Sequence, residues 1–313
     1  MVRLRGAAAE AKNHASALNR DARTVAGAAL RRRRGPFAQQ LRQVAPRLDI
    51  PALRRARDVW AIAMVKNEAD IIESTVRHLV DQGVVNFLVM DNGSDDATLS
   101  ILRELERDIP GFHMGIDSEP AHYQGAKMTL LADAVRRAGA TWVVPFDADE
   151  YWYGAEADLA HVLRHSTASV VEARIHNVFP AEGEGWLIDD QPQHLTKVAF
   201  RAHPFVTVGE GNHAVARPGR WCTQLRIMHL PLRSVEQFER KVTNGAKALA
   251  LTNLPKRTGN HWRQAAGASD EELREQWRQA QRGAVPAMGL TPQGQLAPLL
   301  TLPAAWPPSL SRR

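Results

Sequence analysis

The sequence has almost no cysteine and no long hydrophobic run. Cys222 is the one cysteine among 313 residues, which excludes an intrachain disulfide framework and a multi-cysteine zinc site and fits a reducing compartment. No apolar run approaches the roughly 20 residues that span a bilayer, and the N-terminus lacks the apolar core of a signal peptide. We therefore expect a soluble, cytoplasmic protein.

A glycine-rich loop is also missing where a nucleotide-binding fold of the dinucleotide type would have one. The first predicted strand, Val59–Val65, continues into Lys66, Asn67 and Glu68 instead. Dinucleotide-dependent enzymes and related methyltransferases need glycines at this turn so that the backbone can approach the ligand. The absence excludes both classes for this part of the chain.

The excess of positive over negative charge lies entirely in the N-terminal segment. Residues 1–60 hold 14 Lys and Arg against 4 Asp and Glu, a net charge of +10 that leaves −4 for the rest of the chain. The extension over residues 1–58 is rich in Ala and Arg, and we expect short helices broken by prolines, at Pro36, Pro46 and Pro51. It is predicted to be solvated and partly disordered, or to contact an anionic membrane at its inner face. Nucleic acid is not an expected partner.

Strand and helix patterns alternate from residue 59 to residue 147. Short apolar runs predict strands at Val59–Val65, Asn86–Met90 and Phe112–Ile116, and a fourth in the run that begins at Trp142. Helical patterns separate them, the last over Gln124–Ala138. This alternation predicts right-handed crossovers and a parallel sheet in an α/β fold.

Polar turns follow three of the predicted strands. They contain Asn67 and Glu68, the run from Asp91 to Asp96, and the run from Asp147 to Glu150. Because open α/β sheets bind ligands at the carboxyl ends of their strands, we expect these turns to meet at one edge. Asp147 and Asp149 flank one small residue, so both carboxylates can reach a divalent cation. The alternative is a plain acidic turn.

Two segments together resemble a known family. The segments are AMVKNEADIIESTVRHLVDQGVVNFLVMDNGSDDAT, from Ala63 to Thr98, and VPFDADEYW, from Val144 to Trp152. They are similar to the nucleotide-sugar-dependent glycosyltransferases of family 2, and more narrowly to a branch with KNE and DxDE motifs. The resemblance covers roughly residues 59–250. It implies a GT-A-like, Rossmann-type, mostly parallel sheet flanked by helices.

The resemblance also implies an activity. It predicts a metal-dependent, inverting transfer of a sugar from a nucleotide-diphosphate donor to a hydroxyl of a glycan or lipid-linked saccharide. In such a family the first two turns bind the nucleoside and a basic residue meets a phosphate. The residues carried over to donor binding are Asn67, Glu68, Asp91, Asn92, Lys127 and Asp147. Ser94 or Asp95 is expected to cap the following helix.

The resemblance assigns the metal as Mn²⁺ or Mg²⁺, bound by Asp147 and Asp149. A histidine completes such sites, and His229 or His213 is the expected third ligand. An inverting transfer also needs a base, usually a carboxylate. No clean equivalent of the family's downstream acid is seen, and the candidate catalytic residues are Glu150, Glu210 and His213. Trp152 and Trp186 are candidates for stacking on an acceptor sugar.

Beyond Tyr153 the pattern is less regular. Strands are expected at Val170–Val178, Val198–Val208 and Leu225–His229, and a helix begins at Val235, with Ser234 and Gln237 as a capping pair. The expected division is an extension at 1–58, a glycosyltransferase domain at 59–253 and a C-terminal part at 254–313. That last part is predicted to hold a polar helix at Asp270–Arg282 and a flexible, Pro-rich tail.

Two other functions remain open at this point. A haloacid-dehalogenase-type phosphatase also has an apolar strand that ends in DxD, but normally at its first strand, whereas here the motif follows the fourth. A non-catalytic protein that binds a sugar nucleotide or a glycan would show neither metal dependence nor turnover. Turnover of a nucleotide sugar distinguishes the glycosyltransferase from both.

Overall fold

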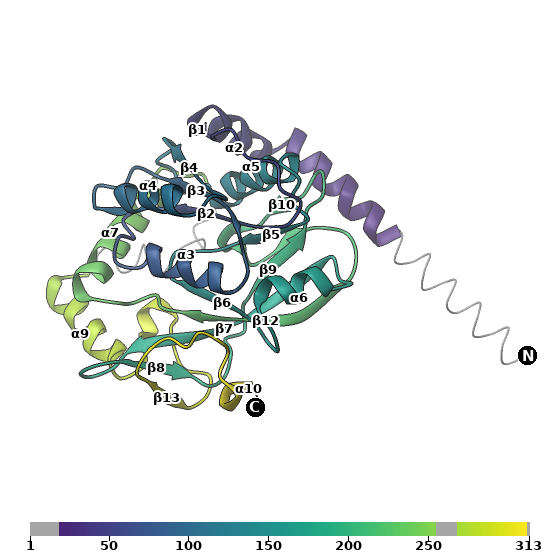
Figure 1. Ribbon diagram of the computed structural model, residues 1–313. Coiled ribbons are helices and arrows are strands. Elements are labelled where there is room, and N and C mark those ends of the chain that lie inside the picture. The colour runs from purple at the N-terminus through teal and green to yellow at the C-terminus, as the bar shows by residue number, and fades with distance from the viewer. Residues whose placement is uncertain (1–18, 255–267, 312–313) are drawn as a thin grey trace, which may run out of the picture.

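The computed structural model describes residues 19–254 and 268–311 (Figure 1). Within these residues the main feature is one mixed sheet of eleven strands, with helices on both faces. A separate two-stranded ribbon joins β10 to β11. The predicted α/β fold class is thereby confirmed. Predictions for residues 1–18 and 255–267 lie outside the described part of the chain.

The strands follow the apolar runs of the sequence closely. In chain order they are β1 (Leu48–Asp49), β2 (Val59–Val65), β3 (Asn86–Asp91), β4 (Phe112–Asp117), β5 (Trp142–Pro145), β6 (Glu150–Gly154), β7 (Val170–Pro180), β8 (Trp186–Asp189), β9 (Thr196–Arg201), β10 (Thr207–Val208), β11 (Val215–Ala216), β12 (Trp221–His229) and β13 (Leu296–Leu299).

The helices lie between these strands and at both ends of the described chain. They are α2 (Pro36–Val44), α3 (Ile72–Asp81), α4 (Thr98–Asp108), α5 (Gln124–Arg137), α6 (Leu159–His165), α7 (Val235–Ala250), α9 (Asp270–Ala280) and α10 (Pro308–Ser311), with 3₁₀ turns η1 (Ala45–Arg47), η2 (Glu210–Asn212) and η3 (Pro286–Met288).

The order of strands across the sheet is β1-β4-β3-β2-β5-β9-β7-β12-β6, and β8 and β13 branch from β7. Strands β4, β3, β2 and β5 are mutually parallel, as the alternation of strand and helix predicts. Beyond β5 the pairings are antiparallel except between β7 and β12. As a result β7 and β12 end at the same edge as β2, whereas β9 and β6 begin there.

Side chains of the central strand β2 alternate between two cores. Val59, Ala61 and Ala63 pack beneath α3, α4 and α6. Trp60 and Ile62 face α5 on the other side. Figure 1 shows this layering, with α3, α4 and α6 on one face and α5, covered by α2, on the other. Because a parallel strand is buried on both faces, its sequence is a nearly unbroken apolar run.

Two details of the strand predictions are wrong. The expected strand at Val198–Val208 is divided, because Pro204 has no backbone N–H and Phe205 has a φ of 66°. The strand β6 was not anticipated, since it begins with the acidic Glu150. It forms because β12 pairs with it along its whole length.

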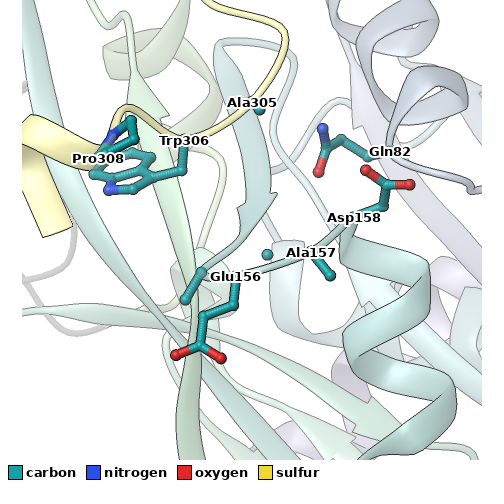
Figure 2. Close-up of a pocket in the computed structure, with 9 residues that line it drawn as sticks. Gln82, Glu156, Ala157, Asp158, Ala305, Trp306 and Pro308 are labelled. Atoms are coloured by element: carbon teal, nitrogen blue, oxygen red, sulfur yellow. The ribbon is translucent and has the colours of Figure 1, made fainter.

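The C-terminal segment does not behave as the flexible tail expected from its prolines. Strand β13 pairs with β8, and Trp306 is 7% exposed, with its ring 5.6 Å from Tyr153 and 4.8 Å from His176. Packing of one aromatic residue and four strand residues therefore holds the segment on the sheet. Trp306 also lines a cavity of about 510 Å³ beside Gln82 and residues 154–158 (Figure 2). This cavity lies where β6 ends, at the edge of the sheet opposite to the polar turns.

The N-terminal segment is helical over residues 19–33 and again in α2, which starts at Pro36 as the proline breaks predict. Arg32 donates to Asp133 and, at 2.8 Å, to the carbonyl of Val206. Arg31, Arg33 and Arg34 are exposed. In the described ranges, no helix combines the length and the apolar character needed to cross a membrane.

Candidate active site

The sheet brings the acidic turn and several distant residues to one edge. His229, the last residue of β12, lies opposite Glu150 on one side and Asn177 on the other. Lys197 is the second residue of β9, which runs antiparallel to β5 and therefore begins where β5 ends. The residues after β5 thus meet side chains that lie 50 to 92 positions later in the sequence.

A buried lysine holds the first half of the motif. Lys197 Nζ lies 2.5 Å from Asp147 Oδ2 and 2.8 Å from Glu150 Oε1, and we refer to these three residues as the Lys197 group. The other oxygen of Glu150 accepts hydrogen bonds from the Asp147 backbone N–H and from Trp152 Nε1, both at 3.2 Å. Glu150 is 1% exposed. Its carboxylate fixes the turn, which corrects its assignment as a catalytic residue.

Asp147 is bound by protein donors at both oxygens. Besides Lys197 at Oδ2, Gln124 Nε2 donates to Oδ1 at 3.0 Å and Asn212 Nδ2 donates to it at 3.1 Å. A metal ion or donor group would have to displace one of these contacts. In this arrangement the Asp147 carboxylate does not fit the role of a metal ligand predicted for it.

A second cation group surrounds Asp149. Lys241 from α7 donates to Asp149 Oδ2, and Arg233 Nη1 and His229 Nε2 lie 3.9 and 3.7 Å from the same oxygen. We call these four residues the Lys241 group. Burial raises the pKa of the Asp149 carboxyl, but Lys241, His229 and Arg233 lower it by more, so that its net shift is downward. Asp149 is therefore ionised at neutral pH.

His229 is held as a neutral imidazole. Its Nδ1 lies 3.0 Å from Asn177 Oδ1, which as an acceptor fixes the proton on Nδ1. Burial lowers the pKa of His229 to about 4, against the opposing effect of Asp149. The lone pair of Nε2 therefore faces the Asp149 carboxylate. A histidine oriented by an outer hydrogen bond beside an ionised carboxylate is a donor set that suits a divalent cation.

Only part of the predicted metal site therefore suits a metal ion. Asp149 and His229 provide suitable donor atoms, although Lys241 contacts the same carboxylate oxygen. Asp147 does not join them, and among the described residues no three carboxylate, histidine or cysteine side chains are grouped as a metal site. His229, rather than His213, is the histidine beside the motif.

The turn after β3 carries an acidic residue with spare hydrogen-bonding capacity. Asp91 Oδ2 accepts the backbone N–H groups of Gly93 and Ser94, both at 3.1 Å. Asp91 Oδ1 is buried and has no hydrogen-bond partner among the described residues, and the residue is 2% exposed. A buried acceptor of this kind is costly unless a ligand completes it.

The neighbouring side chains shape the turns around Asp91. Asn67 accepts from the Asp95 N–H through Oδ1, and its own N–H donates to Ser94 Oγ at 3.0 Å. Asn92 Nδ2 donates to the carbonyls of Asp117 and Glu119. These contacts engage the amide groups within the protein, so the contribution of Asn67 and Asn92 is to hold the turns.

Two of the predicted ligand contacts and one cap are corrected. Lys127 is 1% exposed, lies 2.6 Å from Asp117 and donates to the carbonyl of Glu119, so its ammonium is buried rather than presented to a phosphate. Glu68 lies 2.5 Å from Arg233, which turns its carboxylate toward the Lys241 group. Neither Ser94 nor Asp95 caps α4, whose N-cap is Ala97; Asp96, one residue earlier, accepts the N–H of Thr98.

Glu210 and His213 lie on the turn that also carries Asn212. The Gly211 N–H donates to Gln124 Oε1, which places this turn beside the Lys197 group. Burial raises the pKa of Glu210 to about 7, although a backbone hydrogen bond from Gly125 and the charge of Lys127 oppose the shift. Its Oε2 is buried without a partner in the described chain. His213 Nδ1 bonds the Thr196 carbonyl at 2.9 Å.

The sequence analysis did not identify the basic residues of the site, and it assigned an incorrect role to one tryptophan. Trp152 is fully buried, so it cannot stack on an acceptor, while Trp186 is half-buried on β8. Lys197, Arg233 and Lys241 were not singled out. A signal did exist for Lys197, which is a lone charge followed by the apolar run Val198–Phe200.

The model of the family described as glycosyl transferase family 2 matches residues 60–206. Over this region the chain is similar to the family 2 glycosyltransferases. The match runs from the second residue of β2 to the residue before β10 and confirms the resemblance to this family. It also confirms the predicted class of enzyme.

Several solved structures are similar to the chain. TarS 1–349 of S. aureus in complex with UDP is 13% identical, covers 67% of this chain and 70% of its own, and gives a TM-score of 0.38. The mannosyltransferase PcManGT from Pyrobaculum calidifontis in complex with GDP-Man and Mn²⁺ is 16% identical, covers 88% and 89%, and gives 0.39. HddC from Yersinia pseudotuberculosis is 14% identical, covers 54% and 92%, and gives 0.30. No curated protein sequence matches the chain.

Proposed function

We propose that the domain transfers a sugar from a nucleoside-diphosphate sugar to a hydroxyl group of a glycan or lipid-linked saccharide. The observation that carries this proposal is the buried, unpartnered Asp91 Oδ1 at the end of β3. A carboxylate oxygen accepts hydrogen bonds only, so it suits the N–H of a base or the hydroxyls of a ribose. It lies at the edge where the polar turns of the sheet meet.

Asp149 and His229 would hold the divalent cation, Mn²⁺ or Mg²⁺. When bound, such an ion stabilises the negative charge that develops on a leaving nucleoside diphosphate. Glu210 is the candidate base that takes the proton of the acceptor hydroxyl in an inverting transfer. Burial raises the pKa of both Glu210 and Glu150 to about 7, but Glu210 suits this role better because its Oε2 has no partner in the described chain, whereas both oxygens of Glu150 accept donors there.

The variant Asp91→Asn tests the carrying observation. One oxygen remains to accept the N–H groups of Gly93 and Ser94, while the unpartnered acceptor is replaced by a donor. We expect UDP or GDP, measured by calorimetry with Mn²⁺, to bind about tenfold more weakly. Asp81→Asn, an exposed change at the last residue of α3, is the matched control and should bind like the wild type. Equal binding by all three proteins would contradict the assignment of Asp91.

The variant Asp149→Asn tests the metal ligand. Loss of a ligand at such a site should lower transfer from a UDP- or GDP-sugar about 100-fold. Asp81→Asn should keep full activity in the same assay. Full activity in Asp149→Asn would exclude the metal role of this residue, and binding of nucleotide without turnover in the wild type would favour the non-catalytic alternative.

We also propose that the basic extension makes peripheral contact with an anionic membrane. Exposed Arg31, Arg33 and Arg34 support this, because each basic residue near a charged bilayer contributes about 1 kcal/mol. Arg32 is engaged with Asp133 and would contribute little. Sedimentation with anionic and with neutral vesicles checks the proposal, and equal binding to both would contradict it.

A further inference from the structure

The two lysines of the site hold their acids in different ways. Lys197 is 5% exposed at its side chain and bridges two carboxylates. Lys241 is 20% exposed and contacts one carboxylate, that of Asp149, together with the Pro231 carbonyl at 3.3 Å. Lys241 therefore has a path to solvent and fewer contacts to lose when it moves.

Arg233 is fixed more firmly than Lys241, although both approach Asp149. Its guanidinium is 6% exposed and lies 2.5 Å from Glu68 and 2.6 Å from Asp70, while its distance to Asp149 is 3.9 Å. Releasing Arg233 would leave two further acids without their partner. Among the described cations around Asp149, Lys241 is the one whose departure breaks the fewest contacts with acidic groups.

The atoms that Lys241 faces also suit a cation of higher charge. Asp149 Oδ2 contacts Lys241, and Nε2 of His229 lies 3.7 Å from the same oxygen, while Nδ1 of that imidazole is turned to Asn177 Oδ1. An imidazole lone pair directed at a carboxylate is repulsive unless a positive charge offsets both. One ammonium group provides a single charge, and a divalent ion provides two.

We propose that Lys241 is an exchangeable internal cation of the donor site. It neutralises Asp149 while the metal site is empty, leaves when a divalent cation binds Asp149 and His229, and then pairs with the diphosphate of the donor. This inference rests on the proposed function. A divalent cation and the ammonium group cannot both be in direct contact with Asp149 Oδ2 without strong repulsion, so metal entry displaces Lys241, whereas Arg233 stays 3.9 Å away. A nucleoside diphosphate supplies the negative charge that receives it.

The exchange makes metal and nucleotide binding cooperative. Metal alone must break the contact between Lys241 and Asp149 with no compensating partner for the ammonium. Metal with a nucleoside diphosphate restores that partner. We therefore expect each ligand to strengthen binding of the other, as reciprocal coupling between two sites requires.

The decisive comparison is Lys241→Met against Lys247→Met. Both residues lie on α7, and Lys247 is exposed near its end. Binding of Mn²⁺ alone is measured by electron paramagnetic resonance, and binding of UDP or GDP at saturating Mn²⁺ by calorimetry. Lys241→Met should bind Mn²⁺ alone about tenfold more tightly and the nucleotide about tenfold more weakly, while Lys247→Met should match the wild type in both.

Each half of the proposal has its own failing outcome. Unchanged or weaker Mn²⁺ binding by Lys241→Met would overturn the displacement, and unchanged nucleotide binding would overturn the transfer to the diphosphate. Lys241→Gln, which can still donate to Asp149 without a charge, repeats the test if the Met variant does not fold. A wild type that binds Mn²⁺ and nucleotide normally, beside an unaltered Lys241→Met, refutes this inference alone. Failure of every protein to bind either ligand refutes the proposed function.

Discussion

The Lys197 group and the Lys241 group stand on neighbouring residues of one acidic turn, yet their surroundings differ. Glu150 is 1% exposed, and donors contact both of its oxygens. Donors also contact both oxygens of Asp147. Asp149 is contacted at one oxygen by residues of β12, of the segment that leads into α7 and of α7 itself. Removing one partner of a fully buried pair leaves an uncompensated charge, whereas a partly exposed partner can be replaced. The same motif thus contains a structural half and a half that suits ligand exchange.

The largest effect should come from breaking the structural half. Lys197→Met would leave the buried Glu150 and the partly exposed Asp147 without their cation, and we expect the free energy of unfolding to fall by about 3–5 kcal/mol, chiefly through Glu150. Urea unfolding at pH 7 measures the change. The exposed Lys247→Met should stay within about 0.5 kcal/mol of the wild type. A similarly small change for Lys197→Met would show that both halves exchange partners freely.

Glu210, on the turn beside the Lys197 group, allows a second comparison of buried carboxyl groups. Glu150 has a lysine in contact with it, whereas no such contact is seen for Glu210 in the described residues. Burial raises the pKa of Glu210 to about 7 from an ordinary value of 4.5. Between these values the folded state binds more protons than the unfolded state, so the free energy of unfolding falls as pH rises. Glu210→Gln has no such proton to lose. We expect it to gain about 2 kcal/mol relative to the wild type between pH 4.5 and pH 8.

Urea unfolding of both proteins at the two pH values checks this prediction. Glu104→Gln, the same carboxyl-to-amide change at an exposed position of α4, serves as a control for general pH effects. A parallel pH dependence of the wild type and Glu210→Gln would show that the carboxyl of Glu210 titrates at its ordinary pKa.

The sequence was a good guide wherever local patterns decide the structure. The apolar runs place β2 at its observed bounds and β3 and β4 within one residue, because buried parallel strands have apolar side chains on both faces. The same reasoning brings the turn at Asp91 and the DxDE turn to one edge. It also finds the cap of α7, where Ser234 accepts the Gln237 N–H.

What the sequence could not show is which charges pair. Lys197 lies 50 positions from Asp147 and Lys241 lies 92 positions from Asp149, and no local pattern links such residues. The failure at Lys127 has the same origin, since its partner Asp117 is found through the packing of α5 against the sheet. The fate of the C-terminal segment likewise depended on a distant strand edge, that of β8.

The smallest effect on stability should come from removing the N-terminal cap of α7, the helix that carries Lys241, without changing any charge of the Lys241 group. Ser234 Oγ accepts the Gln237 N–H at 3.1 Å, and its loss in Ser234→Ala should lower the free energy of unfolding by about 1 kcal/mol, measured by urea unfolding. The loss stays small because the Gln237 side chain still accepts the Arg233 N–H at 3.2 Å and holds the first turn of α7. Ser166→Ala, a hydroxyl at the C-terminal end of α6, provides a comparison far from Asp149. A loss above about 3 kcal/mol in Ser234→Ala would mean that α7 is anchored as rigidly as β9, and the contrast between Lys241 and Lys197 would then rest on side-chain exposure alone.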